Sequence, residues 1–424
     1  MLEKKLEHYF DRLFPICRSI TGNGVRESLK IISEIIPLQI HEIPSGTPVF
    51  DWIVPKEWNI QDAYILTPDG RKIADFKKHN LHIVNYSIPI HKKISFDELN
   101  KHLHTLPNKP KAIPYVTSYY KETWGFCISY EEFLTLPQTG KYEVVINSTL
   151  TNGTLTYADC ILPGERSDEI LISTYICHPS MANNELSGPL TSMFLYQKLA
   201  ALSKRKYTYR FVFIPETIGA LVYLKEHGKH LKKHCKAGYV ITCVGDRGIF
   251  HYKQSKYGNT LADKAAQHTL KYSGKPYCIR SFYPGGSDER QYCAPAFNLP
   301  IGSLMRTPYR EYPEYHTSLD NKEWISFKAL AESIELYFQI MQTLENNDIY
   351  INQKPYGEPQ LSKRNLYTDQ LSRAEIMQIM YILQYSDGQN DLIDIAERIN
   401  IPSTELYGLV QLLQKHHLLT YGSY

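Results

Sequence analysis

The chain has 424 residues, of which 43% are hydrophobic and 21% are charged, and its formal net charge is +3 from 47 basic and 44 acidic side chains. At roughly 100–200 residues per domain, this length predicts two to four domains. The ordinary composition excludes disorder on a large scale, and the balanced charge excludes a strongly basic protein that binds nucleic acid or membrane surfaces through its net charge.

The first 37 residues have a helical pattern. Apolar residues recur at helical spacing from Leu2 to Phe14, residues 21–24 interrupt the pattern, and it resumes at Arg26 and ends at Pro37. This charged, amphipathic start lacks the apolar core of a secretory signal. No run of about 18 apolar residues occurs, so we expect no transmembrane helix and no membrane association.

A β-rich segment is predicted between Pro48 and Leu136. Its turn signal is residues 67–70, in which proline presets φ and glycine supplies a positive φ. We interpret residues 48–136 as a small β-rich domain inserted into a main domain that comprises residues 1–47 and 137–345. The expected strands are Ala63–Leu66, Ile73–Phe76 and Leu81–Tyr86.

Strand and helix patterns alternate from Tyr142 onward. Tyr142–Leu150 and Thr154–Leu162 are predicted as a pair of strands around Asn152-Gly153. Further expected elements are the strands Ile170–Ile176, Tyr209–Ile214 and Gly238–Val244, and the helices Leu190–Leu202, Leu221–Leu231, Thr260–Tyr272 and Phe327–Leu344. This alternation predicts an α/β fold with a mixed or mainly parallel sheet sandwiched between helices.

Residues 345–367 are predicted to be a linker and residues 368–424 a winged-helix-like domain. Ser372 and Glu375 form the pattern of a capping box, and three short helical patterns follow. From Arg373 onward this module has three basic and six acidic residues, and its presumed third helix, Ser403–Gln414, has no Lys or Arg. Because DNA affinity depends largely on neutralising phosphates, we predict no nucleic-acid binding. We expect the module to pack against the catalytic domain or against another subunit of a homo-oligomer.

The cysteines are scattered and form no Cys-x-x-Cys pair. This usage predicts free thiols in a reducing cytoplasm and argues against a cysteine-ligated zinc site. The eight residues are Cys17, Cys127, Cys160, Cys177, Cys235, Cys243, Cys278 and Cys293.

Three polar segments follow predicted strands, where open α/β sheets bind ligands. His178 follows the strand Ile170–Ile176, Glu216 follows Tyr209–Ile214, and His316 lies in a third segment. Imidazole is the commonest metal ligand, and a carboxylate can act as a general base. The sequence therefore places His178 and His316 as candidate metal-binding residues in segments at the rim of the sheet, with Glu216 in a third such segment.

The polar segments resemble those of the M28-type zinc aminopeptidases. They resemble more closely a bacterial family with an M28-like catalytic domain, an inserted β-rich domain and a C-terminal winged helix, known as DUF4910 and DUF2172. The resemblance covers essentially the whole chain and rests on CHPSMANNELSG, PETIG, TCVGDRG, PGGSDERQY and EYPEYHTSLDN. It implies a zinc-dependent hydrolase of a small peptide or another amide, in which water is activated at the metal.

The resemblance transfers only part of the aminopeptidase pattern. His178 and His316 match two ligands, and Glu216 matches the general base. Three expected carboxylate ligands are replaced: Asn184 stands at the first position, Thr217 at the second and Thr242 at the third.

The simplest interpretation is one zinc ion, held by His178, His316 and an oxygen of Asn184 or Glu185. Three more residues are candidates for metal or substrate binding. They are Asp246, Asp288 in Gly-Gly-Ser-Asp, and Tyr315.

Structural roles for the same residues stay open. Asn184 suits a helix cap, Glu216 suits a cap or a buried ion pair, and Asp288 suits pairing with Arg290 or Arg306. The position of Cys177 next to His178 suggests a cysteine nucleophile activated by a histidine. Adjacent residues on an extended chain point to opposite faces, so we predict no Cys–His pair.

Two hypotheses about function follow. The first is a metal-dependent amide hydrolase of the aminopeptidase type. The second is a protein with an aminopeptidase fold and little or no turnover that binds a ligand or assembles a complex, with a connection to polysaccharide biosynthesis that the resemblance implies.

Overall fold

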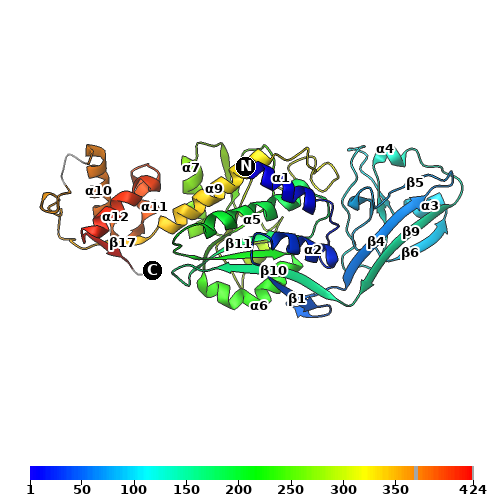
Figure 1. Ribbon diagram of the computed structural model, residues 1–424, viewed down its shortest axis with the longest axis horizontal. Helices are drawn as coiled ribbons and strands as arrows, with labels where there is room; N and C mark the ends of the chain where they lie inside the picture. The colour runs from blue at the N-terminus through cyan, green and yellow to red at the C-terminus, as the bar shows by residue number, and fades with distance from the viewer. Residues whose placement is uncertain (367–370, 423–424) are drawn as a thin grey trace. The chain divides into compact units, whose positions relative to one another are not determined.

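The computed structural model describes residues 1–366 and 371–422, which form two compact units (Figure 1). Unit 1 comprises Met1–Ala262 and Tyr277–Glu335. Unit 2 comprises Asp263–Pro276 and Leu336–Tyr424. Within the described residues, none of the helices has the length and apolar character needed to cross a membrane.

An eight-stranded mixed sheet forms the centre of unit 1, in the order β1-β10-β12-β11-β13-β16-β14-β15. The strands β12, β11, β13 and β16 run parallel, and β1, β10 and β14 introduce antiparallel neighbours. The mixed sheet expected from the alternation is therefore confirmed. The bounds are β1 Gln39–Pro44, β10 Thr154–Leu162, β11 Glu169–Tyr175, β12 Thr208–Ile214, β13 Cys235–Val240, β14 Phe250–Lys253, β15 Tyr277–Arg280 and β16 Ile301–Met305.

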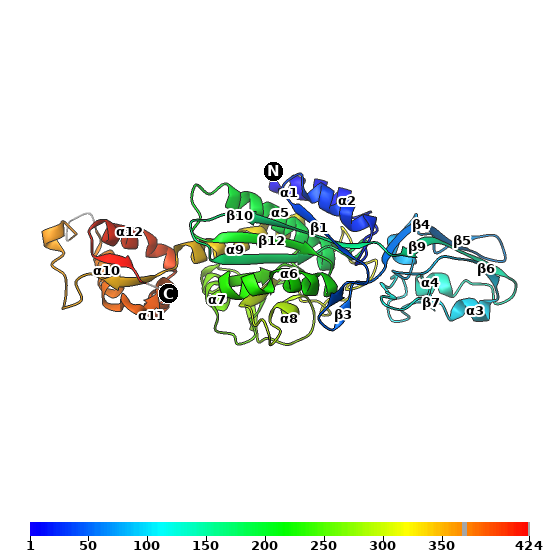
Figure 2. The ribbon, with the colours of Figure 1, turned by 90° about the horizontal axis from the view of Figure 1, so that it is seen from below.

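Helices cover both faces of this sheet. Figure 1 shows α5 and α6 on opposite sides of the strands, and Figure 2 shows α6 in front of them. The expected sandwich is thus confirmed. The helix bounds are α1 Leu2–Leu13, α2 Asn23–Ile32, η2 Ala182–Leu186, α5 Ser187–Ala200, α6 Ile218–His234, α7 Leu261–Tyr272, α8 Glu289–Tyr292 and α9 Phe327–Asn346.

The first turn of α5 packs directly on the strand ends. A Cβ added to Gly188 would lie 2.3 Å from the Thr174 Oγ1 atom and 2.3 Å from the Ile241 carbonyl oxygen. Only glycine permits this approach, because any larger residue would clash with backbone. The contact brings the preceding π-helical turn η2 to the edge of the sheet where β11 ends.

A separate antiparallel sheet, in the order β5-β4-β9-β6, carries the β-rich segment. The predicted pairing of Tyr142–Leu150 with Thr154–Leu162 is wrong, because β9 pairs with β4 and β6 while β10 pairs with β1 and β12. The burial patterns explain the separation: β9 alternates in burial along its length, whereas β10 is buried on both faces. The bounds are β4 Glu57–Leu66, β5 Lys72–Ile73, β6 Ile90–Ile94 and β9 Tyr142–Thr151.

Shorter elements complete this segment. The strand predicted at Leu81–Tyr86 is wrong, since the chain forms a 3-10 turn and Tyr86 has a φ of 78°, which no strand residue adopts. The remaining bounds are β2 Pro48–Val49, β3 Trp52–Ile53, η1 Asn80–His82, α3 Phe96–Asn100, β7 Leu103–His104, β8 Phe126–Cys127 and α4 Tyr130–Phe133.

Within unit 2, a small sheet in the order β18-β17-β19 and the helices α10, α11 and α12 share an apolar cluster, and unit 2 also includes most of α7 and the second half of α9. The predicted capping box at Ser372 and Glu375 is present. The linker prediction for residues 345–367 is wrong in part, because Ile349–Asn352 forms the central strand β17; its apolar run was too short to stand out in a polar segment. The bounds are η3 Ser362–Arg364, α10 Arg373–Tyr385, β18 Asp387–Asp391, α11 Leu392–Arg398, η4 Ser403–Glu405, α12 Tyr407–Lys415 and β19 Leu419–Tyr421. Residues 367–370 of the predicted linker and winged helix, together with 423–424, lie outside the described residues.

Candidate active site

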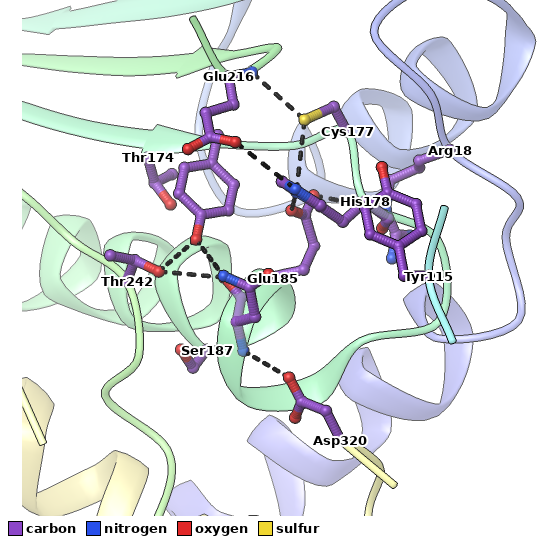
Figure 3. A network of polar contacts seen from close by, with 12 residues as sticks. Arg18, Tyr115, Thr174, Cys177, His178, Glu185, Ser187, Glu216, Thr242 and Asp320 are labelled. Carbon is purple, nitrogen blue, oxygen red and sulfur yellow. Dashed lines mark hydrogen bonds and ion pairs between the residues drawn. The ribbon is translucent and has the colours of Figure 1, made fainter. Parts of the chain in front are cut away.

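The ends of two adjacent parallel strands place His178 and Glu216 side by side. His178 follows β11 and Glu216 follows β12, and the two strands run in register up to Tyr175 and Ile214. The Nε2 atom of His178 lies 3.6 Å from an oxygen of Glu216 (Figure 3). His316 comes from the loop after β16, and its ring centroid is 5.5 Å from that of His178. The structure therefore brings together the three residues that sequence spacing selected.

Glu185 sets the orientation of the His178 ring. Its Oε2 atom lies 2.8 Å from Nδ1 of His178. Burial lowers the pKa of His178 to about 3, so the ring is neutral at physiological pH. Glu185 Oε2 is placed to accept the Nδ1–H bond, which leaves the Nε2 lone pair facing Glu216. At 3.6 Å, Nε2 and the Glu216 oxygen are too far apart for a hydrogen bond, so both remain open to a third group.

Arg18 stands behind this pair and was missed by sequence reasoning. It is completely buried, and its Nε atom donates to the His178 carbonyl at 3.1 Å and lies 3.7 Å from Oε1 of Glu185. Burial raises the pKa of Glu185 to about 8, and the guanidinium opposes that shift by favouring the carboxylate. Arg18 lies in a short link between two helices, 160 residues from His178, where no local pattern signals its role.

Glu216 has the environment of a proton acceptor that works near neutral pH. Burial raises its pKa to about 7, while Arg290 pulls it down. Asp288 lies close by and accepts the Thr217 N–H at 2.7 Å. Burial and then the charge of Glu216 raise the pKa of Asp288 well above its usual range. Among the described side chains, Asp288 forms no ion pair with Arg290 or Arg306. The structural role of an ion-pair partner, which the sequence left open, is therefore not observed.

Asn184 and Thr242, which stand where the aminopeptidase pattern has carboxylates, belong to one hydrogen-bonded network of uncharged side chains. Tyr175, Asn184 and Thr242 bond to one another: the Tyr175 hydroxyl lies 2.6 Å from Thr242 Oγ1 and receives the Asn184 Nδ2–H at 2.6 Å. The Thr242 hydroxyl also donates to the Asn184 carbonyl at 3.0 Å. Asn184 Oδ1 is buried and has no partner among the described residues. The Tyr175 ring is 5.2 Å from that of His178, so this network borders the imidazole.

His316 is held by aromatic rings and by its backbone. Tyr315 stacks on it at 3.9 Å, and its carbonyl accepts the Tyr115 N–H at 2.9 Å. Tyr115 comes from the β-rich segment and also packs edge-on against His178, at 5.3 Å between ring centroids. Burial lowers the pKa of His316 well below its usual value. Its ring nitrogens have no hydrogen bond to any described residue, so the neutral ring is open to a ligand.

Two aspartates near the site support loops. Asp320 accepts the backbone N–H groups of Asn183 and Asn184 at 2.6 and 2.9 Å and thereby caps η2. Asp246, a candidate from the sequence, accepts from Asn183 Nδ2, from the Gly248 N–H and from both the N–H and the hydroxyl of Thr307. These bonds occupy both oxygens of Asp246, so its observed task is to hold this loop.

The prediction that Cys177 and His178 point apart is wrong. Cys177 Sγ lies 3.5 Å from His178 Nδ1, and it also accepts the Glu216 N–H at 3.3 Å. The alternation rule fails because β11 ends at Tyr175, so these two residues are no longer on a strand. Burial raises the pKa of Cys177 well above its usual value, which keeps it a neutral thiol and a poor nucleophile.

A pocket of about 590 Å³ opens beside His178 and Glu216. Its walls carry aromatic side chains from outside the main sheet, together with Arg290 and Gln291. The sequence did not single out these aromatic residues, since they are far along the chain from the motifs. They are Trp52, Tyr119 and Tyr120.

The residues present fit one cation better than two. Two neutral imidazoles and the unpartnered Asn184 oxygen are suitable donors for one zinc ion, with Glu216 beside them. A second ion has no comparable carboxylate set, because Asn184 and Thr242 form a neutral network and Thr217 binds Arg290. Cys177, His178 and Glu185 also have donor atoms within 4.8 Å of one another, but Arg18 beside Glu185 disfavours a cation on that side.

Comparison with known families matches both units. The model of a domain of unknown function, DUF4910, matches residues 7–347, and that of a winged helix-turn-helix matches residues 348–421. A protein of Clostridium acetobutylicum, provisionally named for polysaccharide biosynthesis and an aminopeptidase-like domain, is 48% identical over 396 residues, 92% of this chain and 90% of its own length.

Solved structures support the same fold. A crystal structure from Clostridium acetobutylicum, provisionally named a peptidase, has a TM-score of 0.92 and 45% identity, covering 99% of this chain and 96% of its own. A zinc aminopeptidase from Bacillus subtilis has a TM-score of 0.58 and 13% identity, covering 80% of this chain and 94% of its own. The fold is that of the M28-type zinc aminopeptidases, as the resemblance implied.

Proposed function

The chain belongs to the family described as a domain of unknown function, DUF4910, and we propose that it is a metal-dependent amide hydrolase of the aminopeptidase type. One observation carries this proposal: His178 and Glu216 lie 3.6 Å apart in the lining of a pocket, and the His316 ring is 5.5 Å from that of His178. The aminopeptidase-like relatives support a peptidase-type hydrolase, and the positions of His178, Glu216 and His316 support the finer proposal of a metal-dependent one.

In this proposal His178, His316 and the Asn184 oxygen would hold one zinc ion. A bound zinc ion acts as a Lewis acid toward an amide carbonyl. Glu216 takes a proton from the attacking water and returns it to the leaving amine, and its pKa of about 7 suits both transfers. Glu185 keeps the His178 ring in place, and the aromatic side chains of the pocket wall offer an apolar contact surface to the substrate.

A second candidate function is ligand binding without turnover. The neutral residues Asn184, Thr217 and Thr242 at three expected carboxylate positions favour it. The name of the Clostridium acetobutylicum relative connects that protein with polysaccharide biosynthesis, so an amide on a modified sugar belongs among the substrates to be tested.

Metal analysis and hydrolysis assays on the full chain separate the two. We expect about one zinc ion per chain and hydrolysis of some aminoacyl or acyl anilides. Glu216→Gln should lower kcat about 10²–10⁴-fold without changing the zinc content, because it removes only the proton acceptor. Glu226→Gln, at an exposed position on α6, is the matched control. A protein that takes up no zinc and hydrolyses nothing in the panel supports the second candidate.

A further inference from the structure

Arg290 brings an unneutralised positive charge into the pocket. It lines the pocket together with Glu216 and His178. Its Nη2 atom donates to the Thr217 hydroxyl at 2.9 Å, and its Nε atom is buried without a partner. Among the described side chains, no carboxylate lies within ion-pair distance of it. The guanidinium therefore has hydrogen-bonding capacity that the protein does not use.

The neighbouring carboxylates contact groups other than Arg290. Glu289 Oε1 binds Lys253 Nζ at 2.6 Å and accepts the Tyr309 hydroxyl at 3.0 Å, while Glu289 Oε2 is buried without a partner among the described residues. Asp288 accepts the Thr217 N–H, and its raised pKa favours the neutral acid. Glu216 is left as the one nearby carboxylate in the pocket, and it is committed to the proposed proton transfer.

This charge pattern disagrees with an ordinary aminopeptidase substrate. A peptide with a free N-terminus carries an ammonium group next to the scissile amide. At Thr217 the pattern of the aminopeptidases has a carboxylate, whereas here a neutral hydroxyl holds a guanidinium in place. An ammonium group at this position meets a like charge in a partly buried site, which is unfavourable.

An apolar surface forms another part of the same pocket. Trp52 and Tyr120 lie edge-to-face at 5.6 Å and remain 41% and 50% exposed, respectively. Large aromatic rings left open at a pocket are suited to covering a flat or apolar part of a ligand. The pocket thus combines one cation, one aromatic surface and the proposed catalytic carboxylate.

We propose that the substrate is an amide that carries a carboxylate group, which Arg290 binds, while Trp52 and Tyr120 cover its apolar part. This inference rests on the proposed function for the position of the scissile amide, beside Glu216. Arginine recognises carboxylate and phosphate through paired N–H donors. Arg290 is the guanidinium in the pocket lining, and its one positive charge favours a monoanionic carboxylate over a doubly charged phosphate.

Binding measured without turnover tests this inference. The protein is Glu216→Gln, and the probes are the monoanilide of glutaric acid and the same anilide with a terminal carboxamide. By calorimetry we expect the acid to bind at least about 10-fold more tightly than the amide, since a hydrogen-bonded charge is lost in the amide. Adding Arg290→Gln should abolish this preference, and adding Arg290→Lys should retain part of it.

Adding Lys229→Gln, which removes a positive charge at an exposed position of α6, is the matched control and should keep the full preference. Tighter binding of leucine anilide than of the acid, or a preference that survives Arg290→Gln, overturns the inference. If inorganic phosphate displaces the acid better than acetate does, the preferred anion is a phosphate, and the carboxylate assignment is overturned. Because this experiment measures binding and not hydrolysis, the preference for the acid over the amide can be determined even if the protein has no hydrolase activity.

Discussion

Glu185 is the residue on which the orientation of the candidate metal ligand depends. Metal-binding imidazoles in proteins commonly donate their second N–H to a carboxylate, which fixes the ring and its tautomer. The 2.8 Å contact between Glu185 and His178 Nδ1 has this form. Of the two oxygen donors that the sequence left open, Glu185 is therefore the orienting group, and Asn184 is the better candidate for the ligand.

Glu185→Gln should weaken zinc binding about 10–100-fold, because an amide orients and polarises the imidazole less well than a carboxylate. Competition with a chelator of known affinity measures the change. Glu185→Ala should in addition lower the free energy of unfolding, because it removes the carboxyl group that lies 3.7 Å from the buried Arg18 guanidinium. Glu165→Gln, at an exposed position, is the control. Unchanged zinc affinity in Glu185→Gln would contradict the orienting role.

Residues that follow strands could be located from the sequence, and residues that act across the fold could not. His178 and Glu216 were found because each comes directly after a buried apolar run. Arg18 and Tyr115 reach the site from the N-terminal helices and from the β-rich segment, through contacts between distant parts of the chain. Their own neighbours in sequence carry no periodic or motif signal that predicts such contacts.

At the scale of elements, one ion pair joins a helix and two sheets. Arg26 of α2 donates to Glu57 of β4 at 2.9 and 2.6 Å, and Glu57 also accepts the Thr154 N–H at the start of β10. The hydrogen bonds from Arg26 lower the pKa of Glu57 to about 2. This contact fixes the place where the chain passes from the antiparallel sheet into the main sheet.

The stability contributed by Glu57 should depend on pH in a defined direction. Its folded-state pKa lies below the ordinary value of 4.5, so the contribution is complete above that pH and is lost as the pH falls toward 2. We expect Glu57→Gln to cost about 1–3 kcal/mol at pH 6, since a full pKa unit corresponds to about 1.4 kcal/mol and the pair is partly exposed.

Urea unfolding of unit 1 at pH 6, 4.5 and 3 measures this effect. The difference between Glu57→Gln and the unsubstituted protein should shrink as the pH falls. Glu3→Gln, at an exposed position of α1, should show no such trend. A difference that stays constant from pH 6 to pH 3 would exclude the ion pair as its source.

The elements themselves were predictable where burial is continuous or strictly periodic. The strands β11 and β12 and the helices α5 and α9 lie close to the ranges that the sequence indicated. The sequence also located β9 and β10 but not their partners, because a turn signal at Asn152-Gly153 identifies a change of direction and not the strands' neighbours in a sheet. It also failed for β17, a four-residue strand that is defined by its neighbours in the sheet.

At the scale of the whole molecule, unit 2 contains an apolar cluster made of its own residues. The core cluster around Ile379, Ile382 and Leu413 belongs to unit 2 and shares no residue with the cluster around Leu171 and Val240 in unit 1. Every candidate site residue lies in unit 1. Units with distinct cores melt with distinct energetics, and a ligand stabilises only the state that binds it.

Calorimetry should therefore resolve two unfolding transitions, of which zinc raises only one. At a free zinc concentration 100 times Kd, the stabilisation of unit 1 is about 2.7 kcal/mol. His316→Ala should abolish this shift. Leu413→Ala, at a completely buried position of unit 2, should lower the other transition by about 2–5 kcal/mol and leave the zinc effect intact. A single transition that responds to both zinc and Leu413→Ala would contradict independent unfolding of the two units. A zinc-induced shift that survives His316→Ala would contradict the assignment of His316 as a metal ligand.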